Sequence, residues 1–287
     1  PGANEPAGGS GGFFPAGTGW YRKRFKAPVA WKGLLASIEF DGIYRHGEVW
    51  LNGRRLGLRP GGFTTFRFDL TSLLRLGAEN VIAVRVDNSA QPNARYYTGS
   101  GINRHVRIRL AQPLHLVPDG VQLTTTRLAA DRGELQVNAR VRNTGAEPQA
   151  FTVESTLTDP AGKVAGTVKA KAQAAPGATV PVSLLVKVKR PQAWSPETPV
   201  LYTAVTRVLV DKDKLETDRH AALVGLRTVS VSAARGFELN GQPLKLLGGN
   251  AHSDNGPLGT AAFDHAEFRR AALLKAAGFN AVRTAHN

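Results

Sequence analysis

The chain contains no cysteine among its 287 residues. This absence excludes disulfide bonds, zinc knuckles and a thiol nucleophile from the chain. It leaves the cellular compartment open, because secreted bacterial proteins also often lack disulfides. We expect a periplasmic or secreted location in preference to a cytoplasmic one.

Long apolar runs and a leader sequence are also missing. No run of about 18 or more apolar residues occurs, so the sequence predicts no membrane-spanning helix. No basic-plus-apolar signal peptide heads the chain, and Pro1 is not an initiator, so we expect the natural N-terminus to be missing or processed. With 42% hydrophobic residues, the chain has room for two domains and part of a third.

Acidic residues are scarce, with 22 Asp and Glu against 37 Lys and Arg, for a net charge of +15. So basic a chain first suggests a nucleic-acid partner. The basic residues are, however, spread over predicted strands, with no basic block, zinc finger or aromatic RNA-binding motif. We therefore expect no nucleic-acid partner. A solvated basic surface is the simpler interpretation, and weak attraction to acidic polysaccharide or a membrane surface is the alternative.

Residues 20–110 have no helical pattern of useful length. Short strands with alternating apolar residues are predicted at 34–40, 48–52, 66–70, 80–87 and 105–110. Asn52-Gly53 predicts a hairpin turn. This pattern predicts a jelly-roll β-sandwich. Trp20 and Trp50 could stack on sugar rings, but we expect them to be core or interface residues.

Residues 121–226 again read as strands throughout. Alternation is clear at 135–142, 180–188 and 201–210, with turn residues between these segments at the spacing of a sandwich. The pattern predicts an immunoglobulin-like β-sandwich. Nothing in this stretch suggests a catalytic constellation.

In the last segment, 237–287, the pattern of apolar residues changes from strands alone to strand, helix and strand. Asn240-Gly241 predicts a hairpin turn, and residues 245–249 form a short apolar strand. Asp264 is expected to cap a helix, with Glu267 reaching back in a capping box, and Gly278 to end it. Residues 280–284 then form a second strand. Strand, helix and strand make one βα unit plus the next strand.

Polar residues follow both of these predicted strands. Parallel strands in a (β/α)8 barrel place the chemistry at their carboxyl ends, so this rim is the candidate site. The candidate site residues are Asn250, His252 and Asp254 after the first strand, and Arg283, His286 and Asn287 at or after the second.

The motifs around this rim resemble the opening of the catalytic barrel in family 2 glycoside hydrolases, the β-galactosidase and β-glucuronidase group. They are L-N-G-x-P-x-x-L-x-G-x-N-x-H and L-K-x-x-G-F-N-A-V-R-T-A-H-N. The stretch H-x-D-N-G-P-L-G at 252–259 is most similar to the galactosidase branch. Residues 8–25, 38–57 and 194–202 resemble further stretches of the family.

The resemblance implies a mainly β chain: a jelly-roll sugar-binding-type domain at 1–112 without its first strands, an immunoglobulin-like domain at 113–228, and the start of a truncated TIM barrel at 229–287. It also implies a retaining, exo-acting hydrolase that releases terminal β-galactose. A β-glucuronidase of the same family, or a non-catalytic carbohydrate-binding protein, is the alternative. A carbohydrate substrate and a possible homo-oligomer are expected. No cofactor is indicated, and a cation in the full-length enzyme remains an open alternative.

The resemblance also assigns roles. His252 and His286 are expected to hydrogen-bond sugar hydroxyls, and Arg283 to stand beside the nucleophilic glutamate and lower its pKa. Asp254 is expected to bind a further hydroxyl or to orient His252. Both catalytic glutamates are expected beyond Asn287, so no residue here is assigned as catalytic and the chain alone is expected to be inactive. The loop at 95–104 departs from the family at Asn103, where the family has tyrosine. Two alternatives are open for this loop. It is a glycine-rich turn buried between domains, or it places Arg95 or Tyr97 at the rim of the substrate site.

Overall fold

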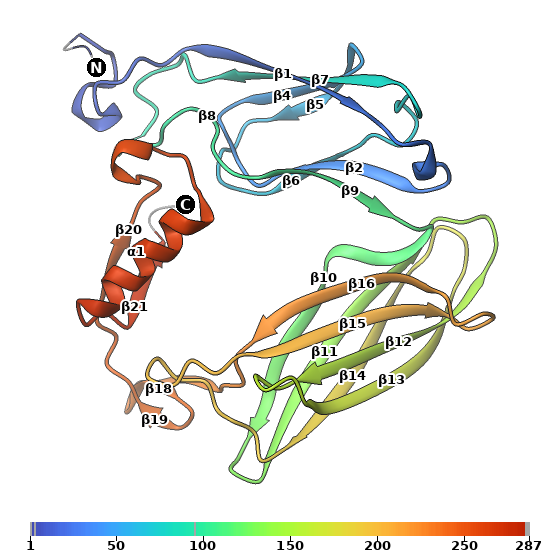
Figure 1. The fold of residues 1–287 in the computed structure, drawn as a ribbon. Helices are drawn as coiled ribbons and strands as arrows, with labels where there is room; N and C mark the ends of the chain where they lie inside the picture. The colour runs from blue at the N-terminus through green and yellow to red at the C-terminus, as the bar shows by residue number, and fades with distance from the viewer. Residues whose placement is uncertain (1, 3, 95, 285–287) are drawn as a thin grey trace. The chain divides into compact units, whose positions relative to one another are not determined.

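The structure is a computed structural model that describes residues 2, 4–94 and 96–284 (Figure 1). Two compact units make up the chain. One combines Pro1–Leu110 with Leu247–Asn287, and the other is Ala111–Leu246. Strands dominate both units, and the one α-helix of the described residues lies in the first. No helix of the described residues has the length and apolar character to cross a membrane.

The first unit contains a jelly-roll sandwich, as the sequence predicts. One sheet has the order β1-β7-β4-β5 and the other the order β6-β2-β9, with a short β3-β8 pair beside them. The strands are β1 (Thr18–Lys26), β2 (Leu35–Phe40), β3 (Ile43–Tyr44), β4 (Gly47–Leu51), β5 (Arg54–Arg59), β6 (Phe66–Asp69), β7 (Glu79–Asp87), β8 (Gly101–Ile102) and β9 (Val106–Ala111).

Alternation along the strands builds the core of this sandwich. Side chains two residues apart share a face, so Val84 and Val86 on β7 point inward to meet Ile38 and Phe40 from β2. Asn52 and Gly53, with φ of 51° and 81°, close the β4–β5 hairpin and confirm the predicted turn.

Trp20 is not a core residue of this sandwich. Its side chain is 62% exposed, and its ring stacks on that of Trp50 with a centroid distance of 5.3 Å. The two tryptophans lie on β1 and β4, which flank β7, and Ala83 on β7 pairs directly with Trp50. Of the two expected alternatives, a core or an interface residue, the core is therefore excluded for Trp20, and the interface alternative remains a prediction.

The second unit is an immunoglobulin-like sandwich. Its two main sheets have the orders β10-β11-β14 and β13-β12-β15-β16. The strands are β10 (Leu114–Leu128), β11 (Arg132–Asn143), β12 (Gln149–Thr158), β13 (Val164–Ala174), β14 (Thr179–Lys189), β15 (Tyr202–Val210) and β16 (Glu216–Val224). Residues Leu135, Val137, Ala139 and Val141 of β11 are buried in its core, as their alternation predicts.

A small sheet of β17 (Val229–Ser232), β18 (Gly236–Leu239) and β19 (Gln242–Pro243) ends this unit. Asn240 and Gly241, with φ of 53° and 75°, close its β18–β19 hairpin at the predicted position. The domain boundaries predicted after residues 112 and 228 remain predictions.

The last segment is the predicted βα unit. Strands β20 (Gly248–Ala251) and β21 (Ala281–Thr284) pair in parallel, joined through the 3₁₀ turn Gly256–Leu258 and helix α1 (Asp264–Ala276). The helix ends as expected, because Gly278 has φ of 89° and Phe279 N–H donates to the Leu274 carbonyl oxygen at 3.0 Å.

The predicted capping box at the start of α1 is wrong. Phe263 is the N-cap and makes no side-chain capping bond, while Asp264 is already helical. The carboxylate of Asp264 lies 2.9 Å from Nε2 of His105, and Glu267 accepts a hydrogen bond from Nδ2 of Asn255 at 2.7 Å. Tertiary partners therefore replace the local bonds.

A buried carboxylate on a central strand is neutralised from both sides in the first unit. Glu39 on β2 is 1% exposed and lies directly opposite Arg67 of β6, whose Nε is 2.5 Å from its carboxylate. Arg109 of β9 approaches from the other side at 2.7 Å. Burial acts to raise the pKa of Glu39, but the hydrogen bonds and charges of Arg109 and Arg67 outweigh it and lower the pKa from its ordinary 4.5.

The second unit repeats this arrangement with a different strand set. Glu154 on β12 is 3% exposed and lies opposite Lys169 of β13 and Arg207 of β15, with which it forms ion pairs. The hydrogen bond from Lys169 is the largest influence and lowers the pKa of Glu154, and Arg207 adds to it against the opposing effect of burial.

Replacing Glu39 with Gln should destabilise the protein by about 1–3 kcal/mol, because it leaves arginines crowded around a group without charge. The side chains of Arg67 and Arg109 are 24% and 55% exposed, which keeps the loss below that of a fully buried pair. Urea unfolding measures it. Glu79→Gln is the matched control, since its pair with Arg24 has side chains 57% and 69% exposed and should be worth about 0.5 kcal/mol or less. Equal losses in both variants would contradict the cross-strand role of Glu39.

The free energy of unfolding should also depend on pH through these two carboxylates. Since their pKa values are lowered in the folded state, their stabilisation is complete above the unfolded value near 4.5 and is lost as the pH falls through the folded values. Urea midpoints should therefore drop steeply below about pH 4.5. A Glu39→Gln protein should lose less over that range than the unchanged protein, and an identical pH profile would count against this assignment.

Candidate functional site

The candidate rim is built on the parallel pair β20–β21. In the register of this pair Asn250 lies opposite Arg283, and Ala251 opposite Thr284. Residues paired across a sheet point to the same face, and successive residues alternate between faces. Asn250 and Arg283 therefore share one face of the two strands, and both side chains are exposed in the described residues.

The opposite face of the two strands is covered by α1. Ala251, Val282 and Thr284 line a cavity of about 420 Å³ together with Ala271 and Leu274 of the helix. In a (β/α)8 barrel the helices lie outside and the other strand face points to the interior. Asn250 and Arg283 thus lie on the face that corresponds to a barrel interior, away from the helix-side cavity.

His252 follows β20 and is half-buried at one end of the helix-side cavity. Its imidazole ring lies against the ring of Tyr96, with a centroid distance of 4.7 Å and an interplanar angle of 60°. Tyr96 comes from the jelly-roll loop that precedes β8. The structure therefore brings a jelly-roll aromatic residue into contact with a predicted rim histidine.

Arg270 of α1 holds the loop after β20. Its guanidinium donates to the carbonyl oxygen of His252 at 2.8 Å, to the carbonyl oxygen of Asp254 and to Oδ1 of Asn255. The Asp254 carboxylate is 60% exposed and lies 3.9 Å from Arg270. Because Arg270 bonds the backbone at two carbonyls, it fixes the path of the loop and so the position of the His252 ring.

The jelly-roll loop at 96–105 docks on the segment that leads into α1. Ala262 N–H donates to the carbonyl oxygen of Asn103 at 2.9 Å, and His105 bonds Asp264 at 2.9 Å. The hydrogen bond from His105, followed by its charge, lowers the pKa of Asp264.

Close packing in this docked loop requires glycine at position 99. Gly99 has φ of 67°, and a Cβ there would come within 2.3 Å of the Thr260 side chain. Any larger residue would push the two segments apart. The loop–loop contact therefore depends on backbone fit as well as on the two hydrogen bonds.

The predicted site residues fall into three groups. Asn250 and Arg283 are brought side by side, whereas His252 and Asp254 lie in the adjacent loop held by Arg270. His286 and Asn287, together with Arg95, lie outside the described residues. Among the described residues, no three His, Cys, Asp or Glu side chains gather as a metal site would require.

Sequence reasoning missed two residues that shape this site, Tyr96 and Arg270. A signal for Arg270 existed, since Glu267 three residues earlier predicts a partner on the same helix face, and their charged groups lie 3.7 Å apart. No local pattern pairs Tyr96 with His252, because 156 positions separate them and only the fold joins them.

The fold defines a multidomain protein with two β-sandwiches and a parallel βα segment. Two sequence models of one family match the chain. The sugar binding domain of glycosyl hydrolases family 2 matches residues 14–112, and the domain described as glycosyl hydrolases family 2 matches residues 117–227. The chain belongs to glycosyl hydrolase family 2.

Individual relatives agree with this membership. A β-galactosidase of Bacteroides ovatus is 39% identical over 99% of this chain, and a putative β-glucuronidase of Formosa agariphila is 37% identical over 96%. The chain spans 33% and 26% of those two proteins, about a third or less of their length.

Solved structures are similar as well. A glycosyl hydrolase family 2 member from Bacteroides cellulosilyticus has a TM-score of 0.95 and 40% identity, with 99% of this chain and 36% of that chain covered. A β-glucuronidase of Bacteroides uniformis has a TM-score of 0.86 and 30% identity, with 96% and 34% covered.

Replacing Arg270 with Ala should free the loop at 252–255. Charge-assisted hydrogen bonds contribute about 1.5–3 kcal/mol each to stability. Their loss should therefore accelerate amide hydrogen exchange in this loop by about tenfold or more. Arg269→Ala is the matched control on the same helix, because Arg269 is exposed and takes no part in these bonds. Equal exchange rates in the two variants would show that Arg270 does not hold the loop.

Proposed function

We propose that the protein is a retaining, exo-acting glycoside hydrolase that releases terminal β-galactose from β-galactosides. The observation that carries the proposal is the parallel pairing of β20 and β21 with Asn250 opposite Arg283, in a chain of glycosyl hydrolase family 2. Parallel strands gather polar side chains at one edge, where barrel enzymes bind their substrates.

The sugar specificity is proposed from similarity and from the residues at the rim. The relative that is 39% identical is a β-galactosidase, and the stretch at 252–259 resembles that branch of the family. We assign His252, His286, Asp254, Asn250 and Asn287 to contacts with sugar hydroxyls. A neutral imidazole donates at one nitrogen and accepts at the other, which suits a hydroxyl.

Arg283 is proposed to act on a carboxylate instead of on the sugar. It shares the interior-type strand face with Asn250, and its side chain is exposed there in the described residues. A guanidinium beside a carboxylate lowers the pKa of that carboxylate, which keeps a nucleophile ionised.

No catalytic carboxylate is assigned within the chain. Retaining hydrolysis requires two carboxyl groups about 5–5.5 Å apart. Near the rim, the Asp264 carboxylate bonds His105. The Glu267 carboxylate accepts a hydrogen bond from Asn255 and forms an ion pair with Arg270. Asp254 is the remaining carboxylate of this loop and cannot serve both roles.

A β-glucuronidase is the second candidate, because a relative with that putative activity is 37% identical. The two activities place different demands on the site. A uronate carboxylate needs a cationic partner, whereas galactose presents only hydroxyls. Hydrolysis of nitrophenyl β-galactoside and β-glucuronide by the protein expressed from its complete reading frame separates them. We expect release from the galactoside, and release from neither would refute the hydrolase.

Replacing His252 with Ala in that protein should lower kcat/KM for the preferred glycoside by about 10- to 100-fold, the cost of one or two hydrogen bonds to the sugar. His265→Ala is the control, since His265 is an exposed histidine on α1. The loss should shrink on a substrate that lacks the hydroxyl which His252 contacts. An equal loss for every deoxy substrate would indicate a structural role.

A further inference from the structure

The backbone and the ring of His252 are held by different parts of the first unit. Arg270 of α1 donates to the His252 carbonyl oxygen at 2.8 Å, which fixes the main chain. The imidazole turns about χ2, a torsion with a broad energy minimum, so a fixed main chain does not set the orientation of the ring. A ring that meets a sugar hydroxyl in one geometry needs support from neighbouring side chains.

The ring of Tyr96 lies in the position to give this support. Its centroid is 4.7 Å from that of His252, and the two ring planes are tilted by 60°. Aromatic pairs favour tilted arrangements with centroids about 4.5–7 Å apart, so the contact is a favourable one. Nδ1 of His252 is closed to solvent in this orientation. A sugar hydroxyl would therefore have to meet the imidazole at Nε2.

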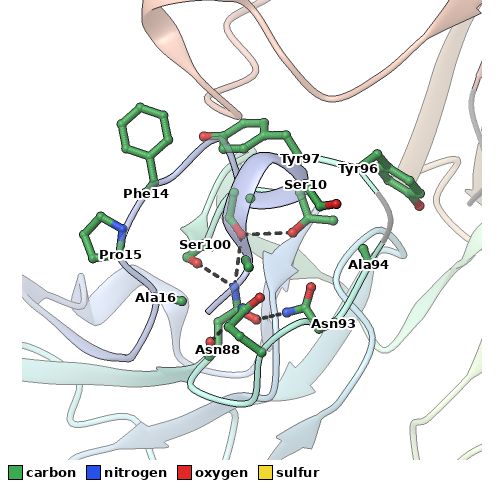
Figure 2. Close-up of a pocket in the computed structure, with 15 residues that line it drawn as sticks. Ser10, Phe14, Pro15, Ala16, Asn88, Asn93, Ala94, Tyr96, Tyr97 and Ser100 are labelled. Carbon is green, nitrogen blue, oxygen red and sulfur yellow. Dashed lines mark hydrogen bonds between the residues drawn. The ribbon is translucent and has the colours of Figure 1, made fainter. Parts of the chain in front are cut away.

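The loop that carries Tyr96 is itself fixed on both sides of that residue. Before it, Asn93 donates to Oδ1 of Asn88. After it, Asn88 donates through Nδ2 to the Gly99 carbonyl oxygen at 3.2 Å and to the Ser100 hydroxyl at 2.7 Å. One side chain that is 3% exposed thus ties the two sides of the segment together (Figure 2).

The direction of the Tyr96 side chain connects this loop with the βα segment. In Figure 2 the side chain points away from Asn88 and its partners, and its ring packs on His252 instead. The backbone bond from Ala262 to Asn103, of 2.9 Å, holds the same loop against the segment that follows His252. The Tyr96 ring therefore reaches the imidazole from a support that does not depend on Arg270.

We infer that Tyr96 is a positioning residue for His252, through which the jelly-roll sandwich influences recognition of the terminal sugar. This inference rests on the proposed binding of a sugar hydroxyl by His252. Tyr96 needs no contact with the sugar in this role, because it acts by restricting the imidazole to orientations that meet the hydroxyl. Loss of the tyrosine ring should therefore matter only while His252 is present.

A double-mutant cycle in the protein expressed from its complete reading frame tests this role. Tyr96→Ala should lower kcat/KM for the preferred nitrophenyl glycoside by about three- to tenfold, the loss of one aromatic pair. Tyr96→Phe keeps the ring and should stay within about twofold of the unchanged protein. In a His252→Ala background, Tyr96→Ala should cost less than about twofold more, because residues that act through one another are not additive.

Chemical labelling of His252 gives a readout that needs no activity. Diethylpyrocarbonate acylates an accessible, unprotonated imidazole, and tandem mass spectrometry assigns each modified histidine. Tyr96→Ala should raise the labelling rate of His252 by about threefold or more, whereas Tyr96→Phe should leave the rate unchanged. His265, an exposed histidine on α1, is the internal reference and should react equally in all three proteins.

Phe13→Ala is the matched control, because Phe13 is a 43% exposed aromatic residue of the same unit. It should change neither the kinetics nor the labelling of His252. Urea unfolding verifies that each variant is folded, and Tyr96→Leu, which also removes the aromatic ring, replaces Tyr96→Ala if that variant does not fold.

Three results would overturn the positioning role of Tyr96. They are an additive loss in the double-mutant cycle, a loss in Tyr96→Phe as large as that in Tyr96→Ala, and equal labelling of His252 with and without the tyrosine ring. Failure of the unchanged protein to cleave either nitrophenyl glycoside would instead refute the proposed hydrolase. Labelling would then still decide whether Tyr96 holds the imidazole.

Discussion

The contact between the jelly-roll loop at 96–105 and the segment 252–264 is the interaction on which the candidate site depends. The backbone bond from Ala262 to Asn103 and the His105–Asp264 pair join parts of the chain about 160 positions apart. These two bonds add to the packing of Gly99 on Thr260 and of Tyr96 on His252, while every residue of α1 is at least partly exposed. The same contact brings Tyr96 against His252.

The basic composition finds a structural use in the sandwiches. Both place one glutamate on a central strand and pair it with cations from the two flanking strands. In both sandwiches, arginines and lysines are held in partly solvated ion pairs with glutamate. These basic residues therefore need not form a continuous binding surface.

Local patterns predicted most of the fold. Asn52-Gly53 and Asn240-Gly241 close hairpins because adjacent positive φ values suit these pairs, and the strands alternate as their apolar residues do. Predictions failed where a tertiary partner competed with a local one. Asp264 was expected to cap its own helix, but it already lies inside the helix, and its carboxylate bonds His105 of the jelly-roll loop instead. Trp20, expected in the core or at an interface, is exposed and stacks on Trp50.

The sequence by itself determined the two sandwiches, the parallel βα segment and the candidate rim residues Asn250, His252 and Arg283, because periodicity and turn residues act over a few positions. Only the tertiary structure decided which groups meet. It set Arg270 on the carbonyls of the rim loop, turned Asn250 and Arg283 to the face away from α1, and brought Tyr96 against His252. These contacts arise from packing between segments far apart in the chain, which no local pattern encodes.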